Sequence, residues 1–221
     1  MIQTDNRRKP MHRLTPWIIL LSILIQGKAF AVEISTDAYL LELNQHFIEL
    51  PQPINDAPDI ELLLHIDSLS SYRVHFGLNL LGNERPELSI KRTPLVNLPS
   101  SRNPAKALII AEQLGLQNNF LNEVFATIHE DEQILMTRED FVEHIEALSS
   151  DKERFLSAFI SPTVNEQVQK LKDFQRKLPV KGAPSIIIRG RWLIDASMVS
   201  STRELLEVIR YLLDTPALPR S

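Results

Sequence analysis

Residues 180–192 read VKGAPSIIIRGRW, a Gly-x-Pro loop that leads into a short apolar segment and then a second glycine. The run from Pro184 to Arg189 is rich in β-branched residues, which predicts a strand. A turn at Gly190 then leads into a second strand over 191–194, so the segment is expected to form a β-hairpin. A helical segment over 201–213 closes this part of the chain.

The residues before this hairpin predict strands and one helix in the order β-β-α-β. Strands are expected over 45–50, 60–66 and 88–96. The second is almost continuously apolar, as in a strand buried on both faces of a parallel sheet. Pro94 indicates that the third strand lies at an edge of the sheet or ends at this residue. A helix capped by Asp67 and Ser68 is expected to end at Gly82-Asn83.

Between residues 103 and 178 every periodic segment is helical. The expected helices are 104–114, 119–129, 138–148, 151–159 and 164–178. The sequence therefore predicts an α/β sheet domain whose chain is interrupted by an all-helical insertion.

This order of elements, together with the Gly182-Ala183-Pro184 loop, resembles the periplasmic thiol:disulfide interchange proteins of the DsbA type over residues 40–213. The resemblance implies a thioredoxin-like fold in two parts, 38–102 and 179–214, with the helical insertion over 103–178 and a tail over 215–221. It also implies a cis peptide bond before Pro184, in a loop that pairs with an extended polypeptide.

The sequence departs from that family where the family carries its Cys-x-x-Cys motif. The chain contains no cysteine, and the turn reads Asp67-Ser68-Leu69-Ser70-Ser71. An aromatic match at Tyr72 places the missing cysteines at Ser68 and Ser71, whereas an acidic match at Glu61 places them at Asp67 and Ser70. In either register thiol–disulfide exchange is excluded, because it requires a thiolate.

The N-terminus has the features of a secretory signal peptide over residues 1–31. Four basic residues up to Arg13 precede the apolar run 17–25, which is too short to span a bilayer, and Ala29-Phe30-Ala31 is a small-x-small cleavage site. Removing residues 1–31 leaves 19 basic and 27 acidic residues, a net charge of −8. We therefore expect a periplasmic protein with no stable membrane insertion after cleavage and no nucleic-acid partner.

Two functions follow from these expectations, and a structural subunit of an envelope complex is a third possibility. The first is a redox-inactive relative that binds extended or partly folded polypeptides at Ala183 and Pro184, as a chaperone, adaptor or assembly factor. The second comes from a resemblance of residues 66–72 to kappa-class glutathione transferases and hydroxychromene-carboxylate isomerases. That resemblance implies Ser70 as the catalytic residue and glutathione as the cofactor.

Three other groups of residues are given structural roles. His65, Asp67 and Ser68 are the residue types of a hydrolytic triad, but a strand end and a helix cap explain them better. The acidic run His129–Glu132 is expected to be a solvated helix end, and no metal site is predicted. Trp192 and Phe174 are expected to pack in the core or between domains.

Overall fold

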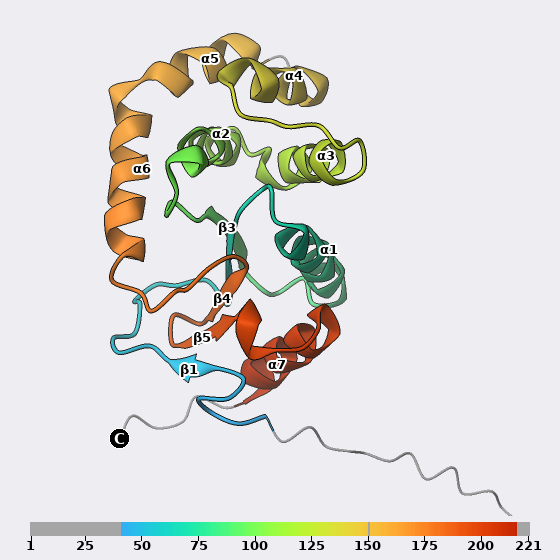
Figure 1. The fold of residues 1–221 in the computed structure, drawn as a ribbon, viewed down its shortest axis with the longest axis vertical. Helices are drawn as coiled ribbons and strands as arrows, with labels where there is room; N and C mark the ends of the chain where they lie inside the picture. The colour runs from blue at the N-terminus through green and yellow to red at the C-terminus, as the bar shows by residue number, and fades with distance from the viewer. Residues whose placement is uncertain (1–40, 150, 216–221) are drawn as a thin grey trace, which may run out of the picture. The chain divides into compact units, whose positions relative to one another are not determined.

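The computed structural model describes residues 41–149 and 151–215, and its centre is a five-stranded mixed sheet (Figure 1). The strand order is β1-β5-β4-β2-β3. Only β2 and β3 are parallel, whereas β4 pairs antiparallel with both β2 and β5. The strands are β1 (Ile48–Glu49), β2 (Ile60–Leu64), β3 (Ile90–Pro94), β4 (Ser185–Ile188) and β5 (Trp192–Asp195).

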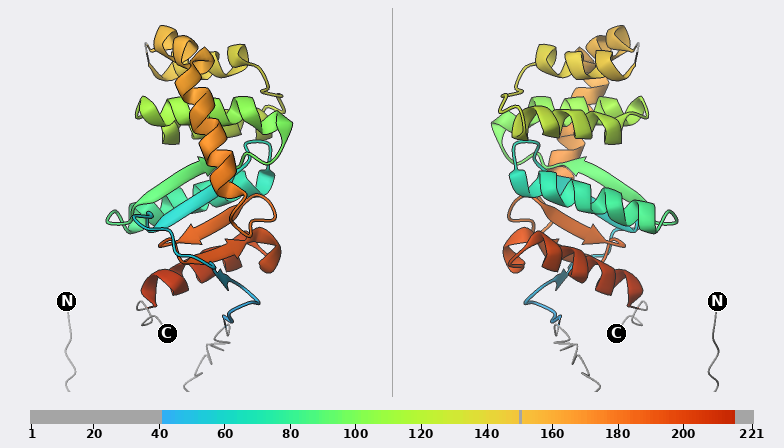
Figure 2. Two further views of the ribbon diagram at one scale, coloured as in Figure 1. Left: turned by 90° about the vertical axis from the view of Figure 1, so that its left-hand side faces the viewer. Right: turned by 90° about the vertical axis from the view of Figure 1, so that its right-hand side faces the viewer.

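Alternation along the central strands gives the sheet two apolar faces. Leu62 and Leu64 of β2 belong to the main core, whereas Leu63 packs on the opposite face with Ile187 and Leu193. Helices α1 (Leu69–Glu84) and α7 (Thr202–Asp214) lie side by side over one face (Figure 2). Leu178 and Val180, from the segment that precedes β4, cover part of the other.

The described residues between β3 and β4 contain helices and no strand, as expected from their periodicity. The helices are η1 (Pro99–Ser101), α2 (Arg102–Gln113), α3 (Gln117–His129), α4 (Arg138–Leu148), α5 (Lys152–Ile160) and α6 (Pro162–Gln175). Fully buried phenylalanines of these helices, among them Phe120 and Phe141, belong to the same hydrophobic core as the residues of the sheet. The exact boundaries of the two sheet segments and the insertion stay predictions.

Three local expectations need correction. The first strand is shorter than 45–50, because a turn with Asn44 at a φ of 67° precedes β1. The sheet around β2 is mixed rather than parallel, although β2 is buried throughout and β3 lies at the edge with Pro94 as its last residue. The helix α1 continues past Gly82-Asn83 to Glu84, because the N–H of Arg85 still bonds to the carbonyl of Leu81.

The hairpin between β4 and β5 requires its glycine. Gly190 has a φ of 64°, and a Cβ there would lie 2.3 Å from the carbonyl oxygen of Ile54. Only glycine combines that backbone conformation with that close approach. The sequence prediction of a hairpin turning at Gly190 is confirmed.

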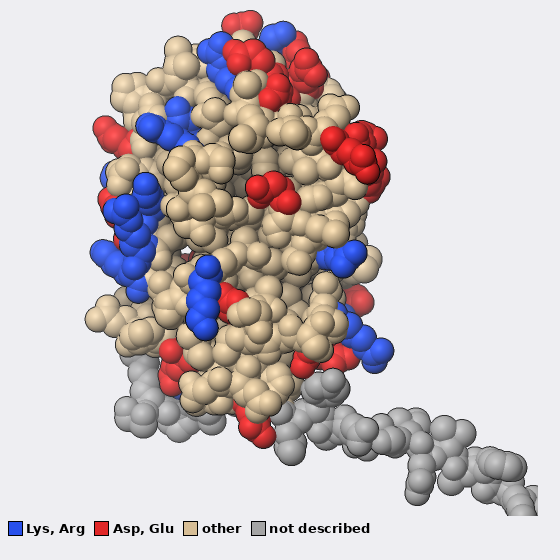
Figure 3. Space-filling view, in the orientation of Figure 1, with Lys and Arg blue, Asp and Glu red and all other residues tan. Residues whose placement is uncertain are grey.

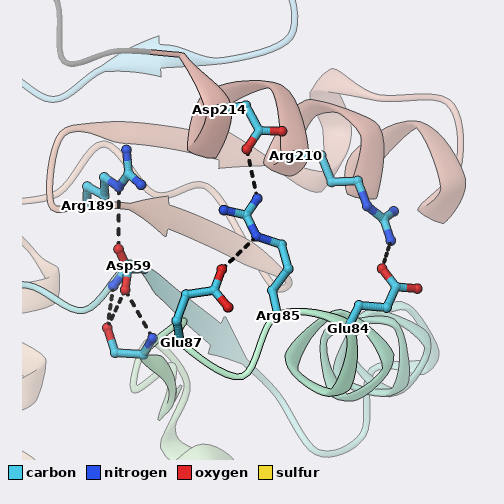
Figure 4. A network of polar contacts seen from close by, with 8 residues as sticks. Asp59, Glu84, Arg85, Glu87, Arg189, Arg210 and Asp214 are labelled. Atoms are coloured by element: carbon cyan, nitrogen blue, oxygen red, sulfur yellow. Dashed lines mark hydrogen bonds and ion pairs between the residues drawn. The ribbon is translucent and has the colours of Figure 1, made fainter.

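Ion pairs join α1 to α7 at the end of α1 (Figure 4). Arg85 bonds to Glu87 and to Asp214, and Arg210 bonds to Glu84. Nearby, Asp59 accepts hydrogen bonds from Ser89 and from Arg189, and the N–H of Ser89 is the main reason that the pKa of Asp59 is lowered. These exposed contacts add little to stability.

A buried polar cluster joins α1, β3 and α3. Arg92 donates from Nε to Nδ1 of His75 over 3.1 Å and from Nη2 to Asn79. The other ring nitrogen of His75 lies 2.7 Å from Oδ1 of Asn122. Burial lowers the pKa of His75 to about 4 and that of Arg92 to about 10. The imidazole is therefore neutral, as an acceptor for Arg92 must be.

The predicted signal peptide, residues 1–31, lies outside the described residues. Within residues 41–149 and 151–215, no helix combines the length and the apolar character needed to cross a bilayer.

Candidate functional site

The turn between β2 and α1 is held by serine hydroxyls at the helix N-terminus. Ser68 is the N-cap, and its Oγ accepts from the N–H of Ser71 over 3.1 Å. Ser71 is fully buried, and its Oγ accepts weakly, over 3.4 Å, from the N–H of His65. Leu69 and Ser70 are exposed between them. The turn therefore has one capping, one buried and one free hydroxyl.

The C-terminal end of α3 supports this turn from a distant part of the chain. Nε2 of His129 lies 3.0 Å from the carbonyl oxygen of Ile66, to which it donates, and the ring stacks on Tyr72. The hydroxyl of Tyr72 donates to Glu130, and this bond raises the pKa of Tyr72. His129 and Glu130 therefore hold the turn and the start of α1 in place. This structural role was not predicted from the sequence. Within the described ranges, no cluster of His, Cys, Asp and Glu could hold a metal ion.

The loop before β4 lies on the other side of the turn. The Ala183–Pro184 peptide bond is cis, as the family resemblance implied. Ser185 anchors the loop by donating to the carbonyl of Gly182 over 2.7 Å, and the carbonyl of Pro184 accepts from the N–H of Ala196. Among the described residues, the backbone N–H and carbonyl of Ala183 have no hydrogen-bond partner.

A polar hollow of about 190 Å³ brings the turn and the loop together. Ser70, Arg73 and Pro184 line it from the two segments that the sequence analysis singled out. Ser200 and Thr202, at the start of α7, line it from a third. The side chains of Ser70 and Arg73 have no hydrogen-bond or ion-pair partner in the described part of the chain. Both are therefore free to contact a ligand.

A second hollow, of about 240 Å³, lies on the Asp67 side of the turn and is largely apolar. The side chains of Ile134 and Met136, which are 82% and 50% exposed, line this hollow. Its other lining residues come from β2 and the turn, from β3 to α2, and from the end of α3 and the loop after it: Leu64, His65, Ile66, Asp67, Pro94, Leu95, Ser100, Ser101, Pro104, Ile128, Gln133 and Leu135. Residues 133–136 were not predicted from the sequence; three consecutive apolar residues, Ile134 to Met136, in an otherwise polar connecting segment were the one available signal.

His65 supplies the only buried side-chain nitrogen without a partner among the described residues. Its Nε2 has no hydrogen bond, and its Nδ1 lies 3.7 Å from Asp67 Oδ1. A buried polar atom without a partner costs free energy, which a bound hydrogen-bonding group would recover. Ser68 makes its bond to the helix N-terminus rather than to His65, so the residues of the formal triad do not assemble.

Three further residues from the sequence analysis line neither hollow. Glu61 is buried in β2 and accepts from Thr93 of β3 over 2.6 Å. Trp192 is half-buried against Phe47 in an edge-to-face contact, as expected of a packing residue. Phe174 is half-buried on α6.

A five-stranded sheet with α1 and α7 on one face, a cis-proline loop beside a helix N-terminus and a helical insertion between β3 and β4 define a thioredoxin-like architecture. The sequence model of the "DSBA-like thioredoxin domain" family matches residues 75–207, more than half of the chain. The chain therefore belongs to that family.

Individual relatives agree with this assignment. The thiol:disulfide interchange protein DsbA of Azotobacter vinelandii is 23% identical over 89% of this chain and 96% of its own length. DsbA of Pseudomonas aeruginosa is 28% identical, but the match spans 47% of this chain and only about half, 49%, of that relative. A crystal structure of the latter protein superimposes with a TM-score of 0.70 at 22% identity, covering 80% of this chain and 95% of the other.

A further solved structure shares the fold and carries a ligand. It is a complex of a cysteine-to-serine variant of DsbA from Proteus mirabilis with a non-covalently bound peptide. It matches with a TM-score of 0.65 at 18% identity, over 79% of this chain and 99% of the other. In contrast to an interchange protein, the present chain has no cysteine, so it has no thiol to exchange.

Proposed function

We propose that the protein is a redox-inactive member of its family that binds extended or partly folded polypeptides in the periplasm. The observation that carries this proposal is the apolar hollow beside the turn, open at Ile134 and Met136 and backed by an unpartnered His65 nitrogen. A bound chain would place an apolar side chain in the hollow, against Ile134 and Met136. The free backbone of Ala183 offers main-chain pairing, which tolerates many sequences.

Two other features support the same function. The Proteus mirabilis structure is that of a cysteine-to-serine variant with a non-covalently bound peptide, so non-covalent peptide binding has a precedent in the fold. Leu69, which is 47% exposed on the turn, adds apolar surface between the two hollows. Asp67 and Glu130 are exposed nearby, which favours clients with basic residues next to an apolar anchor.

The test is binding of reduced, alkylated α-lactalbumin, a model polypeptide that cannot refold or form disulfides. We expect Ile134→Ser and Leu69→Ser each to weaken the affinity about tenfold, as for loss of an apolar anchor. Ile160→Ser is the matched control, because Ile160 is 67% exposed but lies at the end of α5 and belongs neither to the turn nor to a hollow. Absence of binding, or equal losses in all three variants, would refute the function.

A second candidate function is favoured by the polar hollow at Ser70. We propose as the alternative that Ser70 donates to the sulfur of glutathione while Arg73 holds one of its carboxylates. Glutathione near a hundredfold over Kd would then add about 2.7 kcal/mol to stability, or about 5–11 °C in Tm. Ser70→Ala should abolish this shift, whereas Ser157→Ala, an exposed serine on α5, should retain it. Unchanged Tm values with glutathione would eliminate this alternative.

The geometry of the turn also supports one of the two registers of the missing motif. We propose that Ser68 and Ser71 stand where the family has its cysteines, and that Asp67 and Ser70 do not. The capping position of Ser68 and the burial of Ser71 support this register, since a helix N-terminus is where a reactive thiolate is stabilised.

A further inference from the structure

A hollow of about 690 Å³ lies between α6 and the segment that follows β3, and it shares only Leu95 with the apolar hollow of the site above. None of its lining residues belongs to the turn or to the cis-proline loop. The surface is hollowed beside the Lys and Arg side chains that gather along α6 (Figure 3). The volume falls within the range of small-molecule sites, about 300–1,000 Å³.

The walls of this hollow combine apolar side chains with cations. Leu98, Val168 and Leu178 are among its apolar residues. Arg102, Lys172 and Arg176 also line it, and no Asp or Glu does. A wall of this composition matches a ligand with an apolar body and a negative head group.

The three cations are poorly neutralised by the rest of the described chain. The side chain of Lys172 has no hydrogen-bond or ion-pair partner there. Arg102 bonds only to the amide oxygen of Asn165, over 3.3 Å, and Arg176 meets Asp173 at 3.4 Å. The whole chain has a net charge of −4, so this local excess of positive charge is opposite in sign to the charge of the protein as a whole.

The hollow is held in shape by a buried side chain. Gln175 accepts from the N–H of Val96 and donates to the carbonyl of Pro94, both over 2.8 Å. These bonds fix the end of α6 to the end of β3. A preformed wall reduces the entropy that a ligand must lose on binding.

We propose that this hollow binds an amphiphilic anion, a molecule with a carboxylate or phosphate head group and an apolar body. The head group lies against Arg102 and Lys172, and the body lies against Leu98, Val168 and Leu178. This site is independent of the polypeptide-binding site, so it can hold even if that function fails.

The test is calorimetric titration of the full-length protein with decanoate and decyl phosphate, below their aggregation concentrations, alongside decanol and decylammonium. Amide chemical shifts at Leu98 and Leu178 report whether each probe enters the hollow. We expect at least one anion to bind there, with decanol weaker by about tenfold and decylammonium not bound. Binding of decanoate alone or of decyl phosphate alone identifies the head group, and both results support the site.

Three variants locate the head group. Arg102→Gln/Lys172→Gln should weaken the anion about tenfold or more, and Lys172→Gln alone by a smaller factor. Lys170→Gln, on the same helix but outside the hollow, should leave the affinity unchanged. If the double variant has a lowered Tm, the single variant decides, because the Lys172 side chain has no partner to lose. Equal binding of decanol, an equal loss in Lys170→Gln, or shifts elsewhere would overturn the proposal.

Discussion

The Oγ of Ser68 accepts a hydrogen bond from the N–H of Ser71, so in the register proposed above one motif position caps the helix and the backbone of the other donates to that cap. A sulfur atom at position 68 would receive the same N–H and would lie at the positive end of the helix dipole. The scaffold that stabilises a thiolate is therefore present without the thiol.

Restoring cysteines tests the register of the turn. We expect Ser68→Cys/Ser71→Cys to form an intramolecular disulfide and to gain thiol–disulfide exchange activity, measured by insulin reduction. The thiol at position 68 should have a pKa below the ordinary value of about 8.5, as followed by thiolate absorbance. Asp67→Cys/Ser70→Cys is the matched pair, and greater activity in that pair would reverse the assignment.

Loss of the cap tests the local role of Ser68. Ser68→Ala should lower the free energy of unfolding by about 1 kcal/mol, the usual effect of removing a helix N-cap. Ser70→Ala should leave it unchanged, because the exposed Ser70 hydroxyl makes no hydrogen bond in the described structure. Urea denaturation measures both, and equal destabilisation would show that capping is not the role of Ser68.

The buried imidazole of His75 predicts loss of stability in acid. Its pKa is about 4 in the folded protein, because burial disfavours the charged form, against about 6.5 when unfolded. Below the unfolded value, the unfolded chain takes up a proton that the native state does not. The free energy of unfolding should therefore fall as the pH drops from about 6.5 towards 4, by up to about 3 kcal/mol.

Urea denaturation at several pH values, with His75→Asn as the comparison, measures this dependence. His75→Asn should have a shallower slope in that window, because asparagine can accept from Arg92 without titrating. Burial also lowers the pKa of His144, so His144→Gln controls for a second contribution of the same sign. An unchanged slope in His75→Asn would rule out His75 as the source.

The buried side-chain amide of Gln175 is expected to make a large contribution to the free energy of unfolding. Gln175→Leu leaves the buried N–H of Val96 without its partner, together with the carbonyl of Pro94. We expect a loss of about 1–3 kcal/mol, the cost of a buried unsatisfied group. Gln169→Leu, on the same helix but exposed, should lose far less in the same denaturation experiment.

Most secondary structure could be predicted because its signals are local. The apolar run at β2, the glycine of the β4–β5 hairpin and the helical periods of residues 103–178 all depend on neighbours in the chain. Two errors fell at the ends of elements, where α1 passes Gly82 and the first strand shrinks to Ile48–Glu49, and a third was the mixed rather than parallel sheet around β2. End positions depend on tertiary contacts, which override local preference.

Composition alone excludes thiol chemistry, because a chain without cysteine has no thiolate in any conformation. Periodicity likewise established the order of strands and helices. Only the folded chain brings His129 to Ile66, 63 residues apart, and Gln175 to Val96, 79 residues apart. Hollows and buried polar pairs arise from such long-range packing, which residue spacing does not encode, so the apolar and cationic hollows emerged only from the tertiary structure.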